Sequence, residues 1–491
     1  MINRSSKFHQ LIVAFFFNLS IVNVAFTAPD EDPWIRVDNG TLAFSTNLTG
    51  SEALELEQSI RLFSQFSKTF LPVRENYSIP LQLIVFANKT DFDDTVKPRK
   101  FASYTNSELD GVLIVAAPST NKETDLLENL KHELAHYHMR HTSINYPLWY
   151  EEGMATMLSE ATLTLKDKTI HAEFKTPKPT ASFPLKRSTK MVRKAWLVEH
   201  LKRRNLRNIN LRIIHNFYND SHRLANFFHF NENIDPRFSI EALNRHLSNQ
   251  SNSLFSSLDA TPKELVDALW KHQSELKTPQ RLTFSVDQSK AQVTTSALTK
   301  TEVHRTLSAA AEKTNLNGAI DHQLQIVKND DKDHKSMLEL ARLHSLSGNS
   351  KSSDNYLSMA RKLRGRNPAT QVAEASLLVR SCEPSSRACI NQWKEAADLI
   401  REALESDPDN IEAIFSLGVI ELYSGQPGRA VNYLKVAEAH APWSPRINFH
   451  LGEAFRLLGD PIGKTYLIKA RNWAHSNVWR RLAEKSLDNY G

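Results

Sequence analysis

The residues with the clearest capacity for chemistry form the run His132-Glu133-Leu134-Ala135-His136. In a helix, side chains four residues apart project from the same face, so His132 and His136 can bind one metal ion through two imidazoles. Glu133 lies about 100° round the helix, where it can reach a metal-activated water without becoming a ligand. These residue types at this spacing predict a metal-dependent hydrolase with Glu133 as its general base.

A catalytic zinc site needs a third protein ligand and keeps one position open for water. Glu151 and Glu152, which follow the motif along the chain, are the candidates. Neighbouring residues on a helix diverge by about 100°, so only one of these carboxylates can bind the ion. The spacing alone leaves the choice between them open.

With its downstream residues, the motif resembles the gluzincin metallopeptidases, and in particular the peptidase-MA-like family. The residues that carry the resemblance are His132, Glu133, Leu134, Ala135 and His136, followed by Pro147, Trp149, Glu152, Gly153 and Ala155. The resemblance covers about residues 34–160. It implies an α+β zincin-like metallopeptidase domain that binds Zn²⁺ as its cofactor.

The resemblance also implies roles for individual residues. His132, His136 and Glu152 would be the metal ligands, and Glu133 would be the catalytic base that acts on zinc-activated water. The glutamate beside the third ligand replaces an asparagine of many relatives. The strand before the metal helix, here Gly111–Ala117, would be an edge to which a peptide or protein substrate adds.

Further histidines and tyrosines near the motif are interpreted as packing residues. His138 and His141 point toward the apolar side of the metal helix or its edge, so they are not counted as ligands. Tyr104, Tyr146 and Tyr150 carry hydroxyls that could stabilise an oxyanion, but aromatic side chains of this kind more often pack. None of the five is predicted to belong to the site.

The elements that must position the site follow from local patterns. A capping-box spacing at Thr49–Glu52 starts a helix, and buried strands are predicted over residues 80–87 and 111–117. A helix is predicted over about 124–140, and another begins after Pro147.

Residues in the last part of the chain recur at an interval of 34 positions, for example Leu417-Gly418 with Leu451-Gly452. This period, with small residues where two helices touch, resembles the tetratricopeptide repeat and indicates four or five repeats. An excess of nine residues coincides with 381–390, which predicts an insertion between the two helices of one repeat.

The predicted fold class is thus an α+β zincin-like metallopeptidase domain, then an all-α region, then an α-helical tetratricopeptide-repeat solenoid. The predicted parts are a signal peptide over 1–28, the peptidase N-terminal and metal-site region over 29–165, the helical remainder of the peptidase domain over 166–275, a linker over 276–300, and the repeats over 301–491.

The N-terminus is typical of a secretory signal, with Arg4 and Lys7 before a mostly apolar run. We therefore expect a secreted or periplasmic protein with no stable membrane span after cleavage, and an uncleaved N-terminal anchor is the alternative. Cys382 and Cys389 are the only cysteines, and an exported chain permits a disulfide between them.

The net charge is a mild +6, and the basic stretch over residues 186–212 is interpreted as the solvated face of a surface helix. No nucleic-acid partner is expected. The repeats, by contrast, predict a groove for a protein partner or for the substrate.

Three functions compete at this point. The leading hypothesis is an exported zinc peptidase. The second is a non-catalytic periplasmic repeat scaffold with a vestigial zinc-binding domain, which an intact Glu133 disfavours. The third is hydrolysis of a non-protein amide in an envelope polymer.

Overall fold

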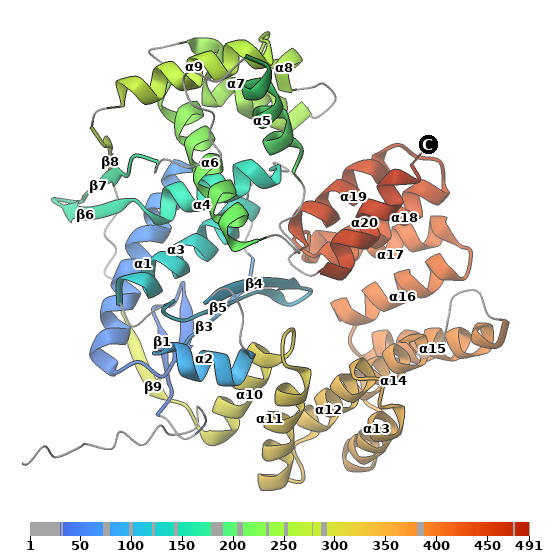
Figure 1. Cartoon of the computed structure of the whole chain (residues 1–491). Helices are drawn as coiled ribbons and strands as arrows, with labels where there is room; N and C mark the ends of the chain where they lie inside the picture. The colour runs from blue at the N-terminus through green and yellow to red at the C-terminus, as the bar shows by residue number, and fades with distance from the viewer. Residues whose placement is uncertain are drawn as a thin grey trace, which may run out of the picture.

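The computed structural model of the chain has three parts, an α+β domain, a helical group above it and a solenoid beside both (Figure 1). The structure describes residues 30, 33–71, 79–97, 102–119, 123–141, 146–177, 190–203, 210–231, 235–249, 254–276, 278–285, 292–380, 387–474 and 477–490. The predicted signal peptide over 1–28 lies outside these residues. No described helix is both long enough and apolar enough to cross a bilayer.

A six-stranded mixed sheet forms the centre of the α+β domain, with strand order β4-β5-β3-β2-β1-β9. The strands are β1 (Ile35–Asp38), β2 (Ala43–Thr46), β3 (Leu81–Val85), β4 (Ser103–Glu108), β5 (Gly111–Ala116) and β9 (Thr294–Ala297). The two predicted strands are confirmed as β3 and β5, which run parallel to each other. The antiparallel partner of β5 is β4, whose polar sequence hides it from a search for apolar runs.

Helices cover both faces of this sheet. They are α1 (Gly50–Phe70) and α3 (Glu123–Arg140) on one face, and α2 (Lys89–Val96) and α10 (Lys300–Ala311) on the other. Successive strand residues point to opposite faces, so Leu83 and Val85 join the core with α1 and α3, whereas Ile84 joins the core with α2 and α10. The predicted capping box at Thr49 is present at the start of α1.

The region predicted as a linker over 276–300 is instead part of both sheets. It contains β8 (Gln280–Ser285), which pairs with β7 (Thr169–Phe174). The strand β7 also forms a hairpin with β6 (Thr162–Lys166). The same region contains β9, which pairs with β1. All four residues of β9 are exposed, and an edge strand without an apolar face cannot be told from a linker by composition. The predicted boundary at 165 likewise falls inside the β6–β7 hairpin.

The helical group consists of α4 (Leu148–Ser159), α5 (Lys190–Lys202), α6 (Leu211–Phe230), α7 (Ile240–Asn249), α8 (Leu254–Ser257) and α9 (Pro262–Glu275). Its contact with the metal-site helix runs through α4, which begins after Pro147 as predicted and packs against both α3 and α6. Within the basic stretch, Leu197 of α5 is buried.

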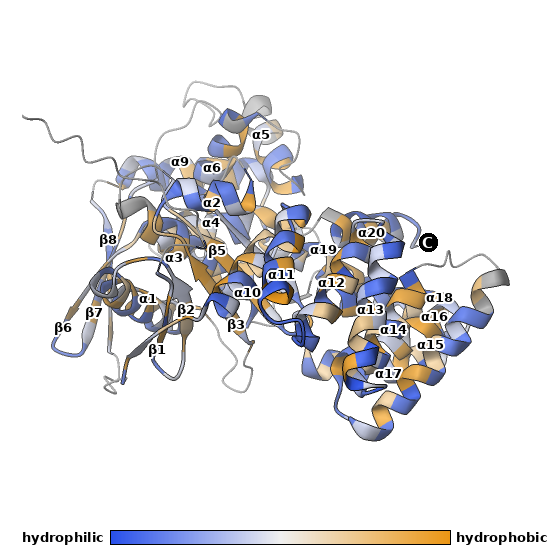
Figure 2. Ribbon diagram, turned by 90° about the horizontal axis from the view of Figure 1, so that it is seen from below, coloured by the Kyte–Doolittle hydropathy of each residue, from blue (hydrophilic) through white to orange (hydrophobic). Residues whose placement is uncertain are grey.

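The C-terminal part is a solenoid of five helix pairs and a final helix, in the range that the structure describes. The helices are α10, α11 (Leu316–Asn329), α12 (His334–Leu346), α13 (Ser350–Arg364), α14 (Pro368–Arg380), α15 (Arg387–Ser406), α16 (Ile411–Tyr423), α17 (Pro427–His440), α18 (Pro445–Leu457), α19 (Ile462–Trp473) and α20 (Asn477–Asp488). Apolar residues line the contacts between these helices (Figure 2).

The spacing of the helix pairs confirms the predicted period and the insertion. First helices start 34 residues apart at Lys300, His334 and Pro368, and the next starts 43 residues later at Ile411. The nine extra residues lie within the pair α14–α15, as predicted. Cys389 in α15 is disulfide-bonded, whereas Cys382 lies outside the described residues.

The solenoid is joined to the α+β domain at several places. The first helix of the solenoid, α10, packs with α2 in the core on one face of the central sheet. The turn of the β4–β5 hairpin reaches the inner side of the solenoid. There the indole N–H of Trp443 donates to the carbonyl oxygen of Glu108 at 2.9 Å, and Lys313 pairs with the carboxylate of Glu108 at 2.7 Å. The α+β domain and the repeats therefore share an interface. It involves β4, the strand that also borders α3.

Candidate metal centre

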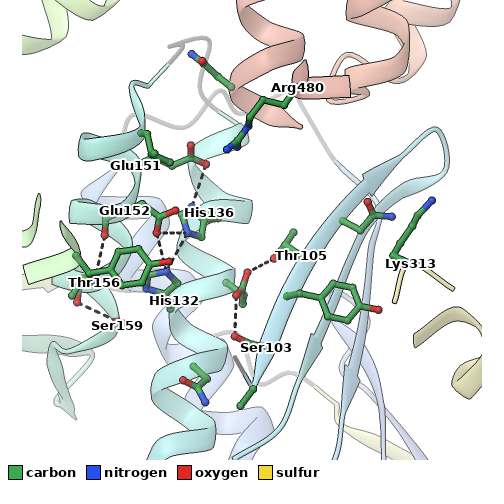
Figure 3. Close-up of a pocket in the computed structure, with 18 of the residues that line it drawn as sticks. Ser103, Thr105, His132, His136, Glu151, Glu152, Thr156, Ser159, Lys313 and Arg480 are labelled. Carbon is green, nitrogen blue, oxygen red and sulfur yellow. Dashed lines mark hydrogen bonds and ion pairs between the residues drawn. The ribbon is translucent and has the colours of Figure 1, made fainter. Parts of the chain in front are cut away.

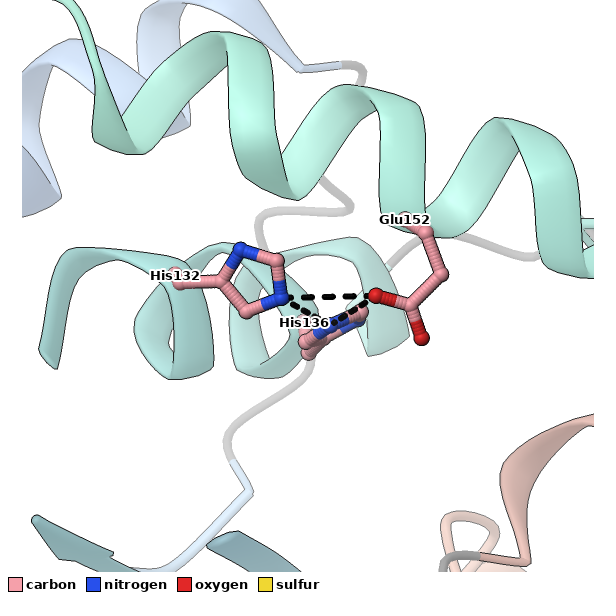
Figure 4. A group of neighbouring side chains, drawn as sticks. All are labelled: His132, His136 and Glu152. Atoms are coloured by element: carbon pink, nitrogen blue, oxygen red, sulfur yellow. Dashed lines mark hydrogen bonds and ion pairs between the residues drawn. The ribbon is translucent and has the colours of Figure 1, made fainter. Parts of the chain in front are cut away.

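The two histidines of the motif and one carboxylate converge as a group between α3 and α4 (Figure 4). The ligand atoms of His132, His136 and Glu152 all lie within 4.8 Å of one another. Oε2 of Glu152 is 3.3 Å from Nε2 of His132 and 3.5 Å from Nε2 of His136. Two imidazoles from one helical turn and a carboxylate from the next helix are the donor set that a divalent ion such as zinc accepts.

The choice between the adjacent carboxylates is resolved by their directions. Glu152 faces the two Nε2 atoms, whereas Oε1 of Glu151 lies 3.2 Å from Nδ1 of His136, on the other side of the ring. A carboxylate in that position holds the imidazole in the tautomer that leaves Nε2 free for a metal ion. The position predicted for Glu152 agrees with the geometry, and Glu151 acquires an orienting role that its spacing did not indicate.

The electrostatics of the group favour an added positive charge. Burial lowers the pKa of His136, but the charge of Glu152 and hydrogen bonds with Glu151 and Glu152 outweigh it and raise the pKa to about 10. Burial opposes ionisation of Glu152, yet attraction to His136 and His132 holds its pKa well below the ordinary value. Oε2 of Glu152 is buried and, among the described residues, its polar neighbours are the two Nε2 atoms at 3.3 and 3.5 Å, so this oxygen is placed to share a metal ion with them.

Glu133 faces the strand β4 and is held there by two hydroxyls. Oγ of Ser103 donates to Oε1 of Glu133 at 2.9 Å, and Oγ1 of Thr105 donates to Oε2. This contact corrects the expectation that Gly111–Ala117 is the edge next to the site: β5 lies between β4 and β3, and β4 is the edge strand that borders the cavity.

The helix α6 closes the site from the side opposite β4, and sequence reasoning missed its contribution. A Cβ atom at Gly153 would lie 2.3 Å from the carbonyl oxygen of Ser221, so the glycine allows α6 to pack directly on α4. This approach brings Tyr218 to the site, with its ring centroid 5.9 Å from that of His132. The glycine after Glu152 was a usable signal, because such a residue in a helix indicates close packing.

Tyr218 is largely enclosed beside the metal ligands, with its hydroxyl protonated. Burial, and then the negative charges of Glu152 and Glu133, raise its pKa well above the ordinary value. A neutral phenol in this place is a hydrogen-bond donor toward the cavity that it lines. Only other tyrosines were candidates for such a donor from the sequence, and Tyr218 was not among them.

Of the other tyrosines, Tyr146 and Tyr150 do not line the cavity, whereas Tyr104 lines it with its hydroxyl bonded to a backbone carbonyl. The hydroxyl of Tyr104 donates to the carbonyl oxygen of Ala310, and Tyr150 lies 3.1 Å from Nε2 of His229. The rings of Tyr146 and Tyr150 are in contact, with centroids 5.1 Å apart.

His138 of α3 and His141, which follows the end of this helix, are also outside the metal group. His138 is buried and stacks on Phe63, and burial lowers its pKa to about 3. Nδ1 of His141 lies 3.1 Å from the carbonyl oxygen of Tyr137. Buried neutral imidazoles among aromatic rings serve the core of the domain.

The metal group lies in a cavity of about 1130 Å³ that three parts of the molecule enclose. Its walls come from α3, α4 and β4, from α6, and from the solenoid, which contributes Lys313 and Arg480 among others (Figure 3). A cavity of this size exceeds the volume of a small-molecule site and can hold several residues of a peptide.

No model of a known protein family and no curated protein sequence matches this chain. Solved structures with similar stretches include a tetratricopeptide-repeat protein of Thermus thermophilus, at 17% identity and a TM-score of 0.31 over 35% of this chain and 91% of that one. PilF of Pseudomonas aeruginosa matches at 15% identity and 0.30, over 39% and 88%. Yeast Tom70 matches at 11% identity and 0.28, over 76% and 75%. Scores this low add nothing to the helix pairing already described.

Proposed function

We propose that the protein is an exported zinc-dependent hydrolase, and specifically a peptidase with a zincin-like metal-site domain. The observation that carries the proposal is the convergence of His132, His136 and Glu152 in one large cavity, with Glu133 on the next position of the same helix. A vestigial site would not need Glu133, its two hydroxyl donors and the enclosed Tyr218 to be kept in place together.

The residues of the chain divide the chemistry among them. When bound, zinc supplies a Lewis acid that makes water nucleophilic near neutral pH. Glu133 would accept a proton from the water that adds to the scissile carbonyl carbon and would give it to the amine that leaves as the C–N bond breaks. Ser103 and Thr105 hold the carboxylate of Glu133 in place. Tyr218 donates a hydrogen bond as negative charge develops on the scissile carbonyl oxygen. The edge strand β4 offers backbone groups with which an extended substrate can pair.

Metal analysis and a cleavage assay test this proposal. The purified protein should carry about one zinc ion per chain, the count for a three-ligand catalytic site, and His136→Ala and Glu152→Ala should lose it. His440→Ala, in an exposed part of the solenoid, is the matched control and should keep the metal.

Glu133→Gln should retain zinc and lose cleavage of a peptide library, because only the proton acceptor is removed. Glu55→Gln, at an exposed position of α1 outside the cavity lining, is the control and should remain active. Zinc retention without cleavage by the unaltered protein would favour the non-catalytic scaffold, and cleavage restricted to envelope-polymer amides would replace the peptidase by the third hypothesis.

A further inference from the structure

The wall of the cavity that faces the metal group carries a concentration of basic side chains from the solenoid. These cavity residues are Lys313, Arg342, Arg380, Arg446 and Arg480. The four arginines belong to α12, α14, α18 and α20, so they come from different parts of the solenoid and line one cavity.

Two of the five are neutralised within the protein and serve its structure. Arg342 pairs with Glu312 at 2.6 Å and also with Glu339, so its guanidinium is occupied. Lys313 pairs with Glu108 at 2.7 Å and with Glu312 at 3.1 Å. These two cations hold the hairpin and the first repeats together.

The other three, Arg380, Arg446 and Arg480, have charge to offer a ligand. Arg380 is exposed to the cavity and forms no ion pair or hydrogen bond with any residue that the structure describes. Arg446 is only loosely paired, at 3.9 Å from Glu108 and 3.6 Å from Glu412.

Arg480 donates from Nε to a backbone carbonyl oxygen at 3.3 Å and has no carboxylate partner among the described residues. Neighbouring positive charges also act on Arg380. Burial lowers the pKa of Arg380, and the charges of Arg446 and Arg342 lower it further. Two carboxylates act in the opposite direction, those of Glu412 and Glu108. An anion bound between the arginines would relieve their repulsion.

We propose that Arg380, Arg446 and Arg480 bind the carboxylates of an acidic peptide that extends from the metal centre to the solenoid. The proposal names the substrate class of the proposed peptidase and rests on that function. Guanidinium groups suit this role because their planar donors match a carboxylate in two-point contact.

A peptide fits better than a nucleic acid or another phosphate polymer. Glu133, Glu151, Glu152 and Glu160 line the opposite wall, so a ligand with charge along its whole length would be repelled there. A peptide can place acidic side chains near the arginines and a neutral backbone near the metal group.

Binding is measured without cleavage, in the zinc-loaded Glu133→Gln variant, by fluorescence anisotropy. The probes are labelled peptides of one length whose central side chains are all glutamate, all glutamine or all lysine. We expect the glutamate peptide to bind at least about tenfold more tightly than the glutamine peptide, with an advantage that shrinks as salt is added.

Arg380→Gln and Arg480→Gln should each reduce this preference about tenfold, the size of one lost charge-assisted hydrogen bond. Arg380→Lys should keep part of it, and Arg380→Glu should shift preference toward the lysine peptide, an outcome that misfolding cannot produce. Arg429→Gln, on the exposed surface of α17, is the matched control and should change nothing.

Equal affinity for the three peptides, or tighter binding of an oligonucleotide of the same charge, would overturn the proposal. The peptidase can fail separately: a chain that binds the glutamate peptide in this way but cleaves no peptide retains the acidic-ligand site and loses the proposed reaction. If the chain instead cleaves neutral peptides and shows no charge preference, the proposed reaction stands and the acidic-ligand site is lost.

Discussion

The metal-site domain and the solenoid reach their folds by different kinds of contact. In the domain, β1 pairs with β9 across more than half of the chain, and the site needs α3, α4, α6 and β4 at once. In the solenoid, each helix packs mainly on its sequence neighbours. A functional site in the domain depends on a few close approaches between distant segments. The solenoid instead distributes its stability over many similar contacts between neighbouring helices.

The strongest test of a site assembled from distant segments is Tyr218→Phe, because Tyr218 comes from a helix far from the motif in sequence. Removing one donor to a developing oxyanion should lower kcat by about 100-fold or more while zinc and KM change little. Tyr423→Phe, an exposed tyrosine of the solenoid, is the control. An unchanged kcat in the Tyr218 variant would remove α6 from the reaction.

The next effect concerns the carboxylate behind the metal ligand. Glu151→Ala should bind zinc about 10- to 100-fold more weakly, because His136 loses the partner that fixes its ring. Competition with a chelator measures the affinity. Glu199→Ala, an exposed glutamate of α5, should behave like the unaltered chain, and an equal affinity in both variants would contradict the orienting role.

A pair of glycine substitutions compares the two regions directly. Gly153→Ala should destabilise the protein by about 2–3 kcal/mol, since the new Cβ would meet backbone at 2.3 Å, which cannot rotate away. Gly418→Ala meets the side chain of Leu434 at 2.8 Å and should cost about 1 kcal/mol, since that side chain can move and alanine favours the helix. Denaturant unfolding measures both, and a reversed order would refute the comparison.

The smallest effect is a pH dependence at the junction of the two regions. Burial opposes ionisation of Glu312, but Arg342 and Lys313 lower its pKa to about 2, below its ordinary value of 4.5. A lowered folded-state pKa gives stability that is present above pH 4.5 and is lost as the pH falls toward about 2. Because the partners are partly exposed, we expect about 1 kcal/mol.

Glu312→Gln isolates that contribution. The variant should be less stable than the unaltered protein at pH 6, and the difference should shrink as the pH falls from 4.5 toward 2, which thermal unfolding can follow. A difference that stays constant over this range would show that the loss of stability has another origin.

The helix pairs of the solenoid and the shared helix face of His132 and His136 could be predicted from the sequence, because both depend on local spacing. The 34-residue interval located the helix pairs, and the insertion at 381–390 followed from a break in that interval. His132 and His136 share a helix face wherever that helix is placed. The strands β3 and β5 could be predicted because most of their residues are apolar and buried.

The sequence did not reveal contacts between distant segments that are polar or carry no motif. The edge strands β4 and β9 have no apolar pattern, and β8 offers only the short alternation of Leu282 and Phe284, so composition predicted a linker over 276–300. Tyr218 lies on an amphipathic helix that carries no motif, and only the packing at Gly153 brings it to the site. The role of Glu151 required the direction of a side chain, which spacing cannot give.

The helix α10 has a consequence for how the protein can be divided. It is the first helix of the solenoid and also covers one face of the central sheet, where Val303 and Leu307 pack with Ile84, Phe86 and Val115. If a protease cut the chain before Lys300 and the two products separated, apolar surface on the sheet and on α10 would be exposed. Both products would then be prone to aggregate. A boundary between the two halves that leaves the core on this face of the sheet intact would have to lie after α10.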